Sequence, residues 1–582
     1  MILSGFYCLS YIVLFLGLLF VKKSEKDQNP AIWLPIILFA TLILGALFAG
    51  LFSLISIPVN LVSSSLTNVT IGAIFFFFII KKKKLQRFRC EMFDILILFI
   101  LFATSLACAF LQFGTSFELN YATSDPAAHL WCAMQIVETG HVSGMYLVHY
   151  IASLFIQAAI PFIGITNSYM PFIVAEVFVF FLSGAVLYSV VGGWLKSSFM
   201  KFSVAGLIVL YMLAYPFNNM LFGFGYLGMG VTSTILLIFA LNLYLGKHVN
   251  RCFGLLLIML GLLGLSISYS LFMPSVYLAT FLVLLFHFRK EGKVFSKKTI
   301  FNLLIIFGLP AAFGLYYALF GMFGDGHNSV SGQLGREGYI YRDLYSNFVI
   351  IAPFILYALA HSIHGRKLSV ETIFFLVNLA VMLVVLVLGI TGKASSYYYY
   401  KFYYLMWPFA MMLAISGFIY LAEKTRTAVV SYCLVWILIM LFAVSGIDQK
   451  LNENYYYYNP QVRSWSYLDI YHFNLDQSRM EATYGLDAIE LAKQADVLRK
   501  NNDSIPVVGK ISDVYWYEAI TNQNLEEYYP WFSEPSVYPE KLRETSYVTI
   551  MPSPEEPGLV AASFIDSEVM FSNGAGYIIK VR

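Results

Sequence analysis

Recurrent apolar segments are the feature that most constrains the fold of this chain. Segments of about 18 to 22 apolar residues, the length of a helix that crosses a bilayer, recur between short basic stretches. Hydrophobic residues make up 59% of the 582 residues and charged residues only 12%, which is more apolar surface than a soluble core could bury. The sequence therefore predicts an α-helical polytopic membrane protein with about 13 to 15 membrane helices.

The membrane spans follow from the positions of these segments. One further apolar segment, 145–165, is long enough to span, but counting it would invert every later basic loop. We therefore interpret it as a juxtamembrane or re-entrant helix. The predicted spans lie near residues 3–20, 31–50, 59–80, 92–112, 170–193, 203–220, 228–246, 252–270, 272–288, 299–322, 346–363, 370–390, 402–421 and 427–446.

Lysine and arginine set the orientation of these spans. Basic clusters follow the first, third, seventh, ninth, eleventh and thirteenth spans, and such clusters belong on the cytoplasmic side of a membrane. The alternate loops then face outward, including the loop 113–145 and the whole tail. We expect a multi-pass protein of the cell membrane with an extracytoplasmic C-terminus.

The tail, 448–582, differs in charge from the membrane part, 1–447. It holds 11 basic and 20 acidic residues, a net charge of −9, whereas the membrane part holds 26 basic and 14 acidic residues, a net charge of +12. Glycines 574 and 576 favour a hairpin turn near the end of the chain. We predict a small soluble α/β domain with helices over 480–500 and 512–521 and strands at 506–509, 547–551 and 576–581.

The segment SDPAAHLW, residues 124–131, stands out at the start of the first long polar loop. It predicts a helix with Asp125 as N-cap, Pro126 at the first helical position and Gly140 just past the end. Asp125 and His129 are four residues apart, so they share one face of this helix. An acid and an imidazole at the mouth of a membrane bundle form a candidate catalytic site. Plain helix capping is the alternative role of Asp125, and capping would lower its pKa.

With SDPAAHLW followed by ETG, the sequence resembles the GT-C superfamily of polytopic glycosyltransferases, especially bacterial members whose first large outward loop opens with an Asp-x-x-x-His helix. The apolar segment 145–165, the late tyrosine-rich turn SSYYYYKFYYLMWP and the outward soluble tail are similar too. The resemblance implies a GT-C-like bundle and a polyprenyl-phosphate sugar donor. It also implies that an acidic residue of the first outward loop, here Asp125, is the catalytic group.

Transfer from a lipid-phosphate sugar needs a base or metal ligand for the acceptor hydroxyl, cations for the departing phosphate and an apolar groove for the polyprenyl chain. Asp125 fits the first role by position, and base and metal ligand both stay open, with Mg or Mn as the candidate ion. His129 is a candidate to orient Asp125, bind phosphate or ligate the metal, and an interfacial histidine is its alternative. Further candidates are Glu118 as a second carboxylate or a solvated loop charge, Glu176 as a buried intramembrane acid or an interfacial one, and, more weakly, His141 and His149.

Cations on the outward side run against the positive-inside trend and are candidates to hold the phosphate. Lys401 begins a span and has Tyr397 and Tyr404 at helical spacing on its face, which suits a phosphate clamp among phenol hydroxyls. A snorkelling lysine in an aromatic belt is the alternative. Arg336 and Arg342 lie in a glycine-rich polar loop that suits either a mobile substrate loop or a solvated connector.

The leading functional hypothesis is a cell-envelope glycosyltransferase that acts on the outer face of the membrane. Its partners would be the polyprenyl-phosphate sugar donor, a glycan or cell-wall polymer acceptor and the lipid bilayer, with no nucleic acid. A polymerase or ligase of lipid-linked polysaccharide is one alternative, and it would depend on arginines in later outward loops rather than on the first-loop carboxylate. A transporter or lipid flippase is another, and it should show repeated halves with broken spans, which this sequence lacks.

Overall fold

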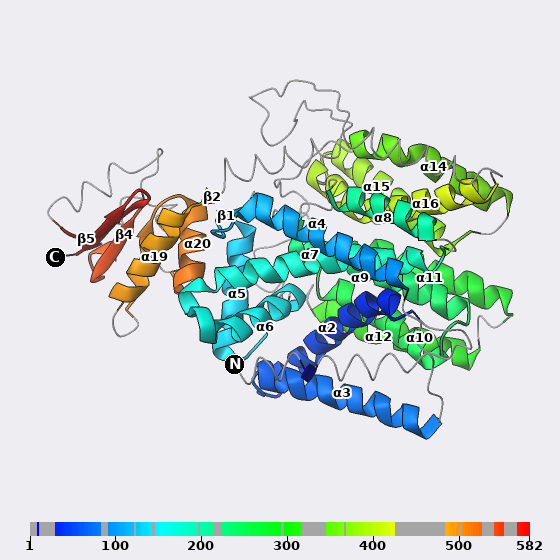
Figure 1. Cartoon of the computed structure of the whole chain (residues 1–582), viewed down its shortest axis with the longest axis horizontal. Helices are drawn as coiled ribbons and strands as arrows, with labels where there is room; N and C mark the ends of the chain where they lie inside the picture. The colour runs from blue at the N-terminus through cyan, green and yellow to red at the C-terminus, as the bar shows by residue number, and fades with distance from the viewer. Residues whose placement is uncertain are drawn as a thin grey trace.

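The computed structural model describes most of the membrane part and the core of the tail. Figure 1 shows long helices lying side by side, with a small α/β unit at the end of the molecule that carries the C-terminus. The described residues are 9–10, 29–82, 91–121, 124–142, 146–195, 198–213, 220–221, 223–292, 296–316, 345–365, 368–424, 483–499, 503–525, 541–551 and 567–581.

Helices dominate the membrane part, as the sequence predicts. Within the described residues, eight helical segments are long and apolar enough to cross a membrane, which makes this a multi-pass membrane protein. The predicted spans 3–20 and 427–446 lie outside the described residues, apart from 9–10. The membrane-part helices are α2 (Pro30–Leu54), α3 (Leu61–Lys82), α4 (Met92–Phe113), α7 (Tyr169–Gly192), α8 (Ser198–Leu213), α9 (Gly225–Leu245), α10 (Arg251–Ser266), α11 (Met273–Lys290), α12 (Lys297–Tyr316), α14 (Tyr345–His364), α15 (Val370–Ile390) and α16 (Ser396–Lys424).

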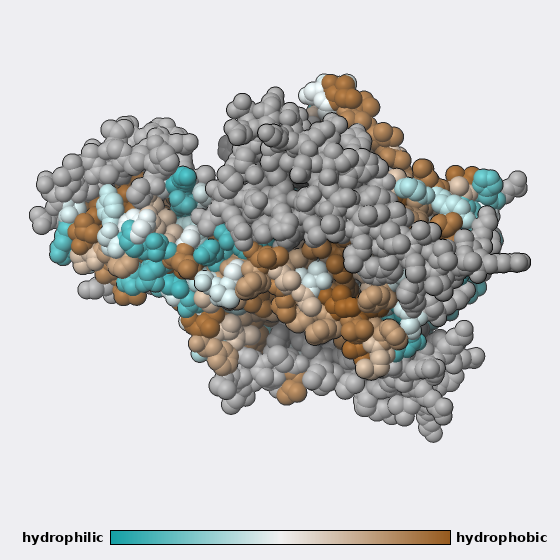
Figure 2. Space-filling view, turned by 45° about the horizontal axis from the view of Figure 1, so that its top comes forward, coloured by the Kyte–Doolittle hydropathy of each residue, from teal (hydrophilic) through white to brown (hydrophobic). Residues whose placement is uncertain are grey.

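Burial divides these helices into inner and outer ones. Most of the apolar stretch of α7, α9 and α16 is buried inside the protein, whereas α4, α12 and α15 leave most of theirs exposed. Exposed apolar helix faces of this kind are stable against lipid tails, which are as apolar as leucine. Figure 2 shows the hydrophobic colour along the helices and the hydrophilic colour gathered towards the α/β unit.

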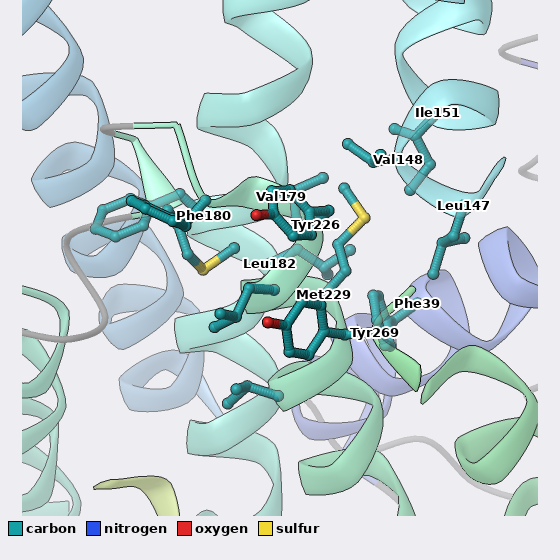
Figure 3. Packing of buried hydrophobic residues seen from close by; sticks show 14 of the residues in the cluster. Phe39, Leu147, Val148, Ile151, Val179, Phe180, Leu182, Tyr226, Met229 and Tyr269 are labelled. Atoms are coloured by element: carbon teal, nitrogen blue, oxygen red, sulfur yellow. The ribbon is translucent and has the colours of Figure 1, made fainter. Parts of the chain in front are cut away.

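Two shorter helices connect α4 to α7. Helix α5 (Asp125–Thr139) holds the SDPAAHLW motif, and α6 (Tyr146–Ile163) covers the segment 145–165, followed by the 3-10 turn η1 (Ile165–Asn167). Helix α6 packs against α5 and α7, and Figure 3 shows its residues Leu147, Val148 and Ile151 in the apolar cluster with Tyr226 and Tyr269. That α6 is a juxtamembrane or re-entrant helix and does not cross the bilayer stays a prediction.

A buried charged cluster ties four helix ends together. The Lys201 ammonium lies 2.9 Å from the carboxylate of Asp94 and 2.5 Å from that of Glu91. Tyr188 and Asn29 donate further hydrogen bonds to Asp94, which is fully buried. The cluster joins the starts of α2, α4 and α8 to the end of α7. The alternation of basic loops predicts that these four helix ends lie together on the cytoplasmic side of the membrane. From the predicted spans, Glu176 is the one acid expected inside the bilayer, but the helices also bury Asp94 and Glu371 of α15.

The described tail residues form an α/β unit. Helices α19 (Leu486–Leu498) and α20 (Ile511–Thr521) pack with a sheet of order β3-β4-β6-β5, made of β3 (Val507–Val508), β4 (Tyr547–Ile550), β5 (Glu568–Asn573) and β6 (Gly576–Lys580). Strands β3 and β4 are parallel, and β6 is antiparallel to both β4 and β5. The hairpin predicted at glycines 574 and 576 joins β5 to β6. Strand β5 was not predicted, because its side chains are mostly exposed and show little apolar alternation.

The α/β unit packs directly on the first loop of the membrane part. Strand β1 (Leu119–Asn120) pairs antiparallel with β2 (Thr483–Tyr484), and the ring of Tyr121 stacks on Trp516 of α20 at 5.4 Å. At the far end of α5, Asn522 donates a hydrogen bond to Glu138. The unit and the Asp125 helix therefore lie on the same side of the membrane, and that this side faces outward stays a prediction.

Candidate functional site

The start of α5 leaves Asp125 without a capping role. Ser124 occupies the N-cap position, Asp125 is the first helical residue and Pro126 follows it, so the prediction of Asp125 as N-cap is wrong by one residue. The fixed φ and missing N–H of proline suit any position of the first turn, so the motif alone does not set the register. Gly140 ends the helix with φ 71°, as predicted, and a Cβ there would lie 2.9 Å from Pro58. Asp125 accepts no hydrogen bond from the described residues.

The environment of Asp125 raises the pKa of its carboxyl group. Surrounding protein displaces water and disfavours the charged form, while the positive charge of Lys401 opposes this rise. Protein surrounds most of the carboxyl group, but the residue as a whole keeps exposed surface, which leaves a path for a substrate hydroxyl. The lowered pKa expected from capping is wrong, because the capping hydrogen bond is absent and burial dominates. A raised pKa suits a general base better than an unperturbed aspartate would.

His129 is a neutral, buried imidazole rather than a cation. Burial, and secondly the neighbouring His149 of α6, lower its pKa to about 3. Its Nδ1 lies 3.0 Å from Nε2 of His149, and its ring contacts Tyr226 with a centroid distance of 4.8 Å. Within the described structure it makes no hydrogen bond to Asp125. A neutral imidazole can ligate a metal but cannot bind phosphate by charge.

Lys401 lies buried at the start of α16 among aromatic rings. Its Nζ is 4.4 Å from the ring centroid of Tyr397 and 5.3 Å from that of Tyr269, both within range of cation–π attraction. Tyr404, the other predicted neighbour, packs on Phe224 at 6.1 Å. Lys401 forms no ion pair with a described residue, and Asp125 is the described acid whose charge it senses.

A row of aromatic side chains connects the two predicted positions. Tyr226 of α9 contacts His129 on one side and Tyr269 on the other, with 5.7 Å between the tyrosine ring centroids, and Tyr269 lies under Lys401. In Figure 3 the hydroxyl oxygens of Tyr226 and Tyr269 point to the same side. Tyr226 lies in the aromatic, glycine-rich stretch 215–230, whose pattern suits either stacking on sugar rings or core packing, and Tyr269 lies in an apolar stretch that also fits core packing.

The other predicted site residues are not part of this cluster. Glu176 is buried and accepts a hydrogen bond from Tyr121. Glu118 is half-buried, 3.5 Å from the amide of Asn120. Arg336 and Arg342 lie outside the described residues. His141 is exposed at the end of α5.

The described residues contain no group of three or more His, Cys, Asp or Glu side chains placed to hold a metal ion. Asp125 and the neutral His129 are the predicted ligands in this region, and the described residues add no third one.

Comparisons with known proteins give only a distant likeness. No protein-family model matches the sequence, and no curated protein matches it. Among solved structures, the oligosaccharyltransferase of Archaeoglobus fulgidus in its apo form has 12% identity and a TM-score of 0.46, over 78% of this chain and 69% of that one. The same enzyme in complex with Zn and sulfate gives 12% identity and a TM-score of 0.44, over 83% of this chain and 73% of that one.

Proposed function

We propose that this protein is a membrane glycosyltransferase of the GT-C type that transfers a sugar from a polyprenyl-phosphate donor to a glycan or other acceptor on the outer face of the membrane. The observation that carries this proposal is the placement of Asp125 and Lys401. A carboxyl group with a raised pKa and a buried lysine that forms no ion pair with a described residue lie within electrostatic reach of each other at one end of the bundle. They come from helices that are far apart in the sequence.

The two groups have complementary roles in such a transfer. Asp125 accepts the proton of the acceptor hydroxyl as the oxygen attacks the anomeric carbon of the sugar. The bond from that carbon to the phosphate oxygen breaks, and the electron pair leaves with the polyprenyl phosphate. The Lys401 ammonium stabilises the negative charge that develops on the phosphate, in a position where protein has already excluded water.

An apolar surface lies at the end of α15, the helix that precedes the lysine in the chain. Helix α15 ends at Ile390, a short turn leads to the start of α16, and Val384, Val387 and Ile390 on the last turns of α15 are exposed. A polyprenyl chain that contacts this surface would bring its phosphate to the level of Lys401.

A polymerase or ligase of lipid-linked polysaccharide could use the same lysine, and so could a lipid flippase. Neither of them requires the Asp125 carboxylate. Substitution of Asp125 therefore separates the proposed transferase from both alternatives.

The test is Asp125→Asn in purified protein assayed with a polyprenyl-phosphate sugar, with and without a chelator. Because asparagine keeps the size of the side chain but cannot act as a base, we expect transfer to fall by about a hundredfold or more. The unfolding free energy should stay within about 1 kcal/mol of the parent, since Asp125 makes no capping hydrogen bond.

Asp503→Asn, which removes an exposed carboxylate of the α/β unit, serves as the control and should keep full activity. Transfer by Asp125→Asn at the parental rate would exclude Asp125 as the base, and loss of transfer on chelation would assign it to a metal instead.

A further inference from the structure

A recess of about 440 Å³ lies where α4 ends and the first loop begins. This volume falls in the range of about 300 to 1,000 Å³ that is usual for small-molecule sites. The recess is lined by residues that include Phe110, Gln112, Thr115, Ser116, Glu118 and Asn120.

The walls of this recess are held rigidly. The Gln112 amide donates to the Asn120 carbonyl at 2.8 Å, and the Asn120 amide donates back to the Gln112 carbonyl at 2.8 Å. The backbone N–H of Glu118 donates to the Phe113 carbonyl at 2.9 Å and closes the turn between them. Phe117 in this turn adopts φ 57°, which is rare for an aromatic residue and is found where surrounding contacts fix the backbone. A site that is already ordered loses less entropy when it binds a ligand.

The polar groups of the recess are hydrogen-bond acceptors and hydroxyls. Gln112 is fully buried, and its Nε2 donates to the carbonyls of both Asn120 and Leu221, which fixes the orientation of the amide. Its Oε1 then has no hydrogen-bond partner among the described residues, and an unpaired buried acceptor is energetically costly. Glu118 adds a carboxylate. No lysine or arginine lines the recess in the described part of the chain, so an anionic ligand such as a phosphate does not fit.

Neutral sugars match this set of groups. Sugar hydroxyls donate to the Glu118 carboxylate, and Thr115 and Ser116 add hydroxyls that can both donate and accept. Phe110 is 60% exposed and offers an aromatic face to the apolar side of a sugar ring. The recess also lies close in sequence to the proposed base, since Glu118 precedes Asp125 by seven residues, whereas Lys401 belongs to α16.

We propose that the recess formed by Gln112, Thr115, Ser116 and Glu118 is a subsite for a neutral glycan, in which Glu118 accepts hydrogen bonds from sugar hydroxyls. This proposal rests on the proposed transferase function and identifies the acceptor side of it. The sugar can belong to a free glycan or to a glycolipid headgroup, because both present the same hydroxyls.

The experiment measures binding of two ligands to the full-length protein in nanodiscs by native mass spectrometry. One probe is a mixture of neutral di- to tetrasaccharides, and the other is a polyprenyl-phosphate monosaccharide. Glu118→Gln should weaken oligosaccharide binding about tenfold or more and leave binding of the polyprenyl-phosphate probe within twofold, since one charged hydrogen bond is lost. Lys401→Ala should weaken binding of the polyprenyl-phosphate probe and leave oligosaccharide binding within twofold. Asp503→Asn is the control that should leave the binding of both probes unchanged. Nanodiscs doped with a neutral glycolipid form a second arm, in which competition with the oligosaccharides identifies a lipid-linked source.

The outcomes separate the two proposals. Oligosaccharide binding that Glu118→Gln leaves unchanged, or no oligosaccharide binding by the parent and no binding of the glycolipid, overturns the subsite. Failure of the parent to bind the polyprenyl-phosphate probe overturns the proposed donor without affecting the test of the recess. If Glu118→Gln reduces binding of both probes equally, the substitution acts through the fold and the subsite is contradicted.

Discussion

Among the described residues, Lys201 with Asp94 and Lys401 with Asp125 lie at opposite ends of the membrane helices, and the two pairs are built differently. At one end Lys201 contacts Asp94 at 2.9 Å, and Glu91 and Tyr188 complete the hydrogen bonds. At the other end Lys401 and Asp125 sense each other's charge but form no direct ion pair, and aromatic rings surround the lysine.

This difference indicates which pair is structural. A buried ion pair whose members satisfy each other has no capacity left for a ligand, and its loss mainly affects folding. A buried lysine without an anionic partner is costly for the apo protein and becomes favourable when a negatively charged ligand arrives. Substitutions at the two ends should therefore have different consequences.

Removing the lysine of the satisfied pair should have the largest effect. Lys201→Ala leaves Asp94 buried without its cation, so we expect a loss of about 3 to 5 kcal/mol in unfolding free energy. Replacement of both residues by apolar ones, Lys201→Met with Asp94→Leu, should recover much of this loss. Thermal unfolding in detergent is the measurement. Lys247→Ala, which removes an exposed lysine 3.8 Å from Glu291, is the matched control and should change stability by less than about 0.5 kcal/mol. If Lys201→Ala changed the unfolding free energy as little as Lys247→Ala does, the Lys201–Asp94 pair would not be structural.

Removing the other lysine should affect the substrate instead of the fold. Lys401→Ala should leave the melting temperature at or above that of the parent, because the apo protein loses an unpaired buried charge. Donor binding should weaken by about 1.5 to 3 kcal/mol, seen as a raised donor KM, and Lys401→Arg should restore part of it. Parental kinetics in Lys401→Ala would show that this lysine belongs only to an aromatic belt.

The pH dependence should give the smallest and most specific effect. Because the pKa of Asp125 is raised and the base must be ionised, kcat/KM should rise with pH, with its acid limb above the ordinary range of an aspartate. The charge of Lys401 lowers this pKa, so Lys401→Met should move the acid limb to still higher pH. A carboxyl group whose pKa is raised by folding stabilises the protein below its unfolded pKa, and this contribution is lost as the pH rises through the folded pKa. Asp125→Asn should therefore not lower the melting temperature at neutral pH, and an unshifted acid limb in Lys401→Met would contradict the coupling of the two groups.

The sequence predicted the parts of the fold that depend on local pattern. Span length, helix stops such as Gly140 and the hairpin at glycines 574 and 576 follow from apolar periodicity and backbone preference, which neighbouring residues determine. Asp125 was proposed from its motif and the resemblance that the motif carries, and Lys401 from its outward position at the start of a span. In the structure each lies within range of the other's charge.

What the sequence could not predict depends on contacts between distant segments. The pairing of β1 with β2 joins two-residue strands separated by more than 350 residues, too short for any strand pattern. The contact of His129 with His149 and the raised pKa of Asp125 depend on how α5 and α6 pack, and the buried Asp94 is recognisable only once Lys201 lies beside it.

The most direct test of the account is the position of the donor phosphate in a cryo-electron microscopy structure of the protein with a polyprenyl-phosphate sugar. We expect the phosphate in hydrogen-bond contact with Lys401 Nζ, with the anomeric carbon between it and the Asp125 carboxylate. A phosphate bound away from Lys401, or a sugar that Asp125 cannot reach, would contradict it.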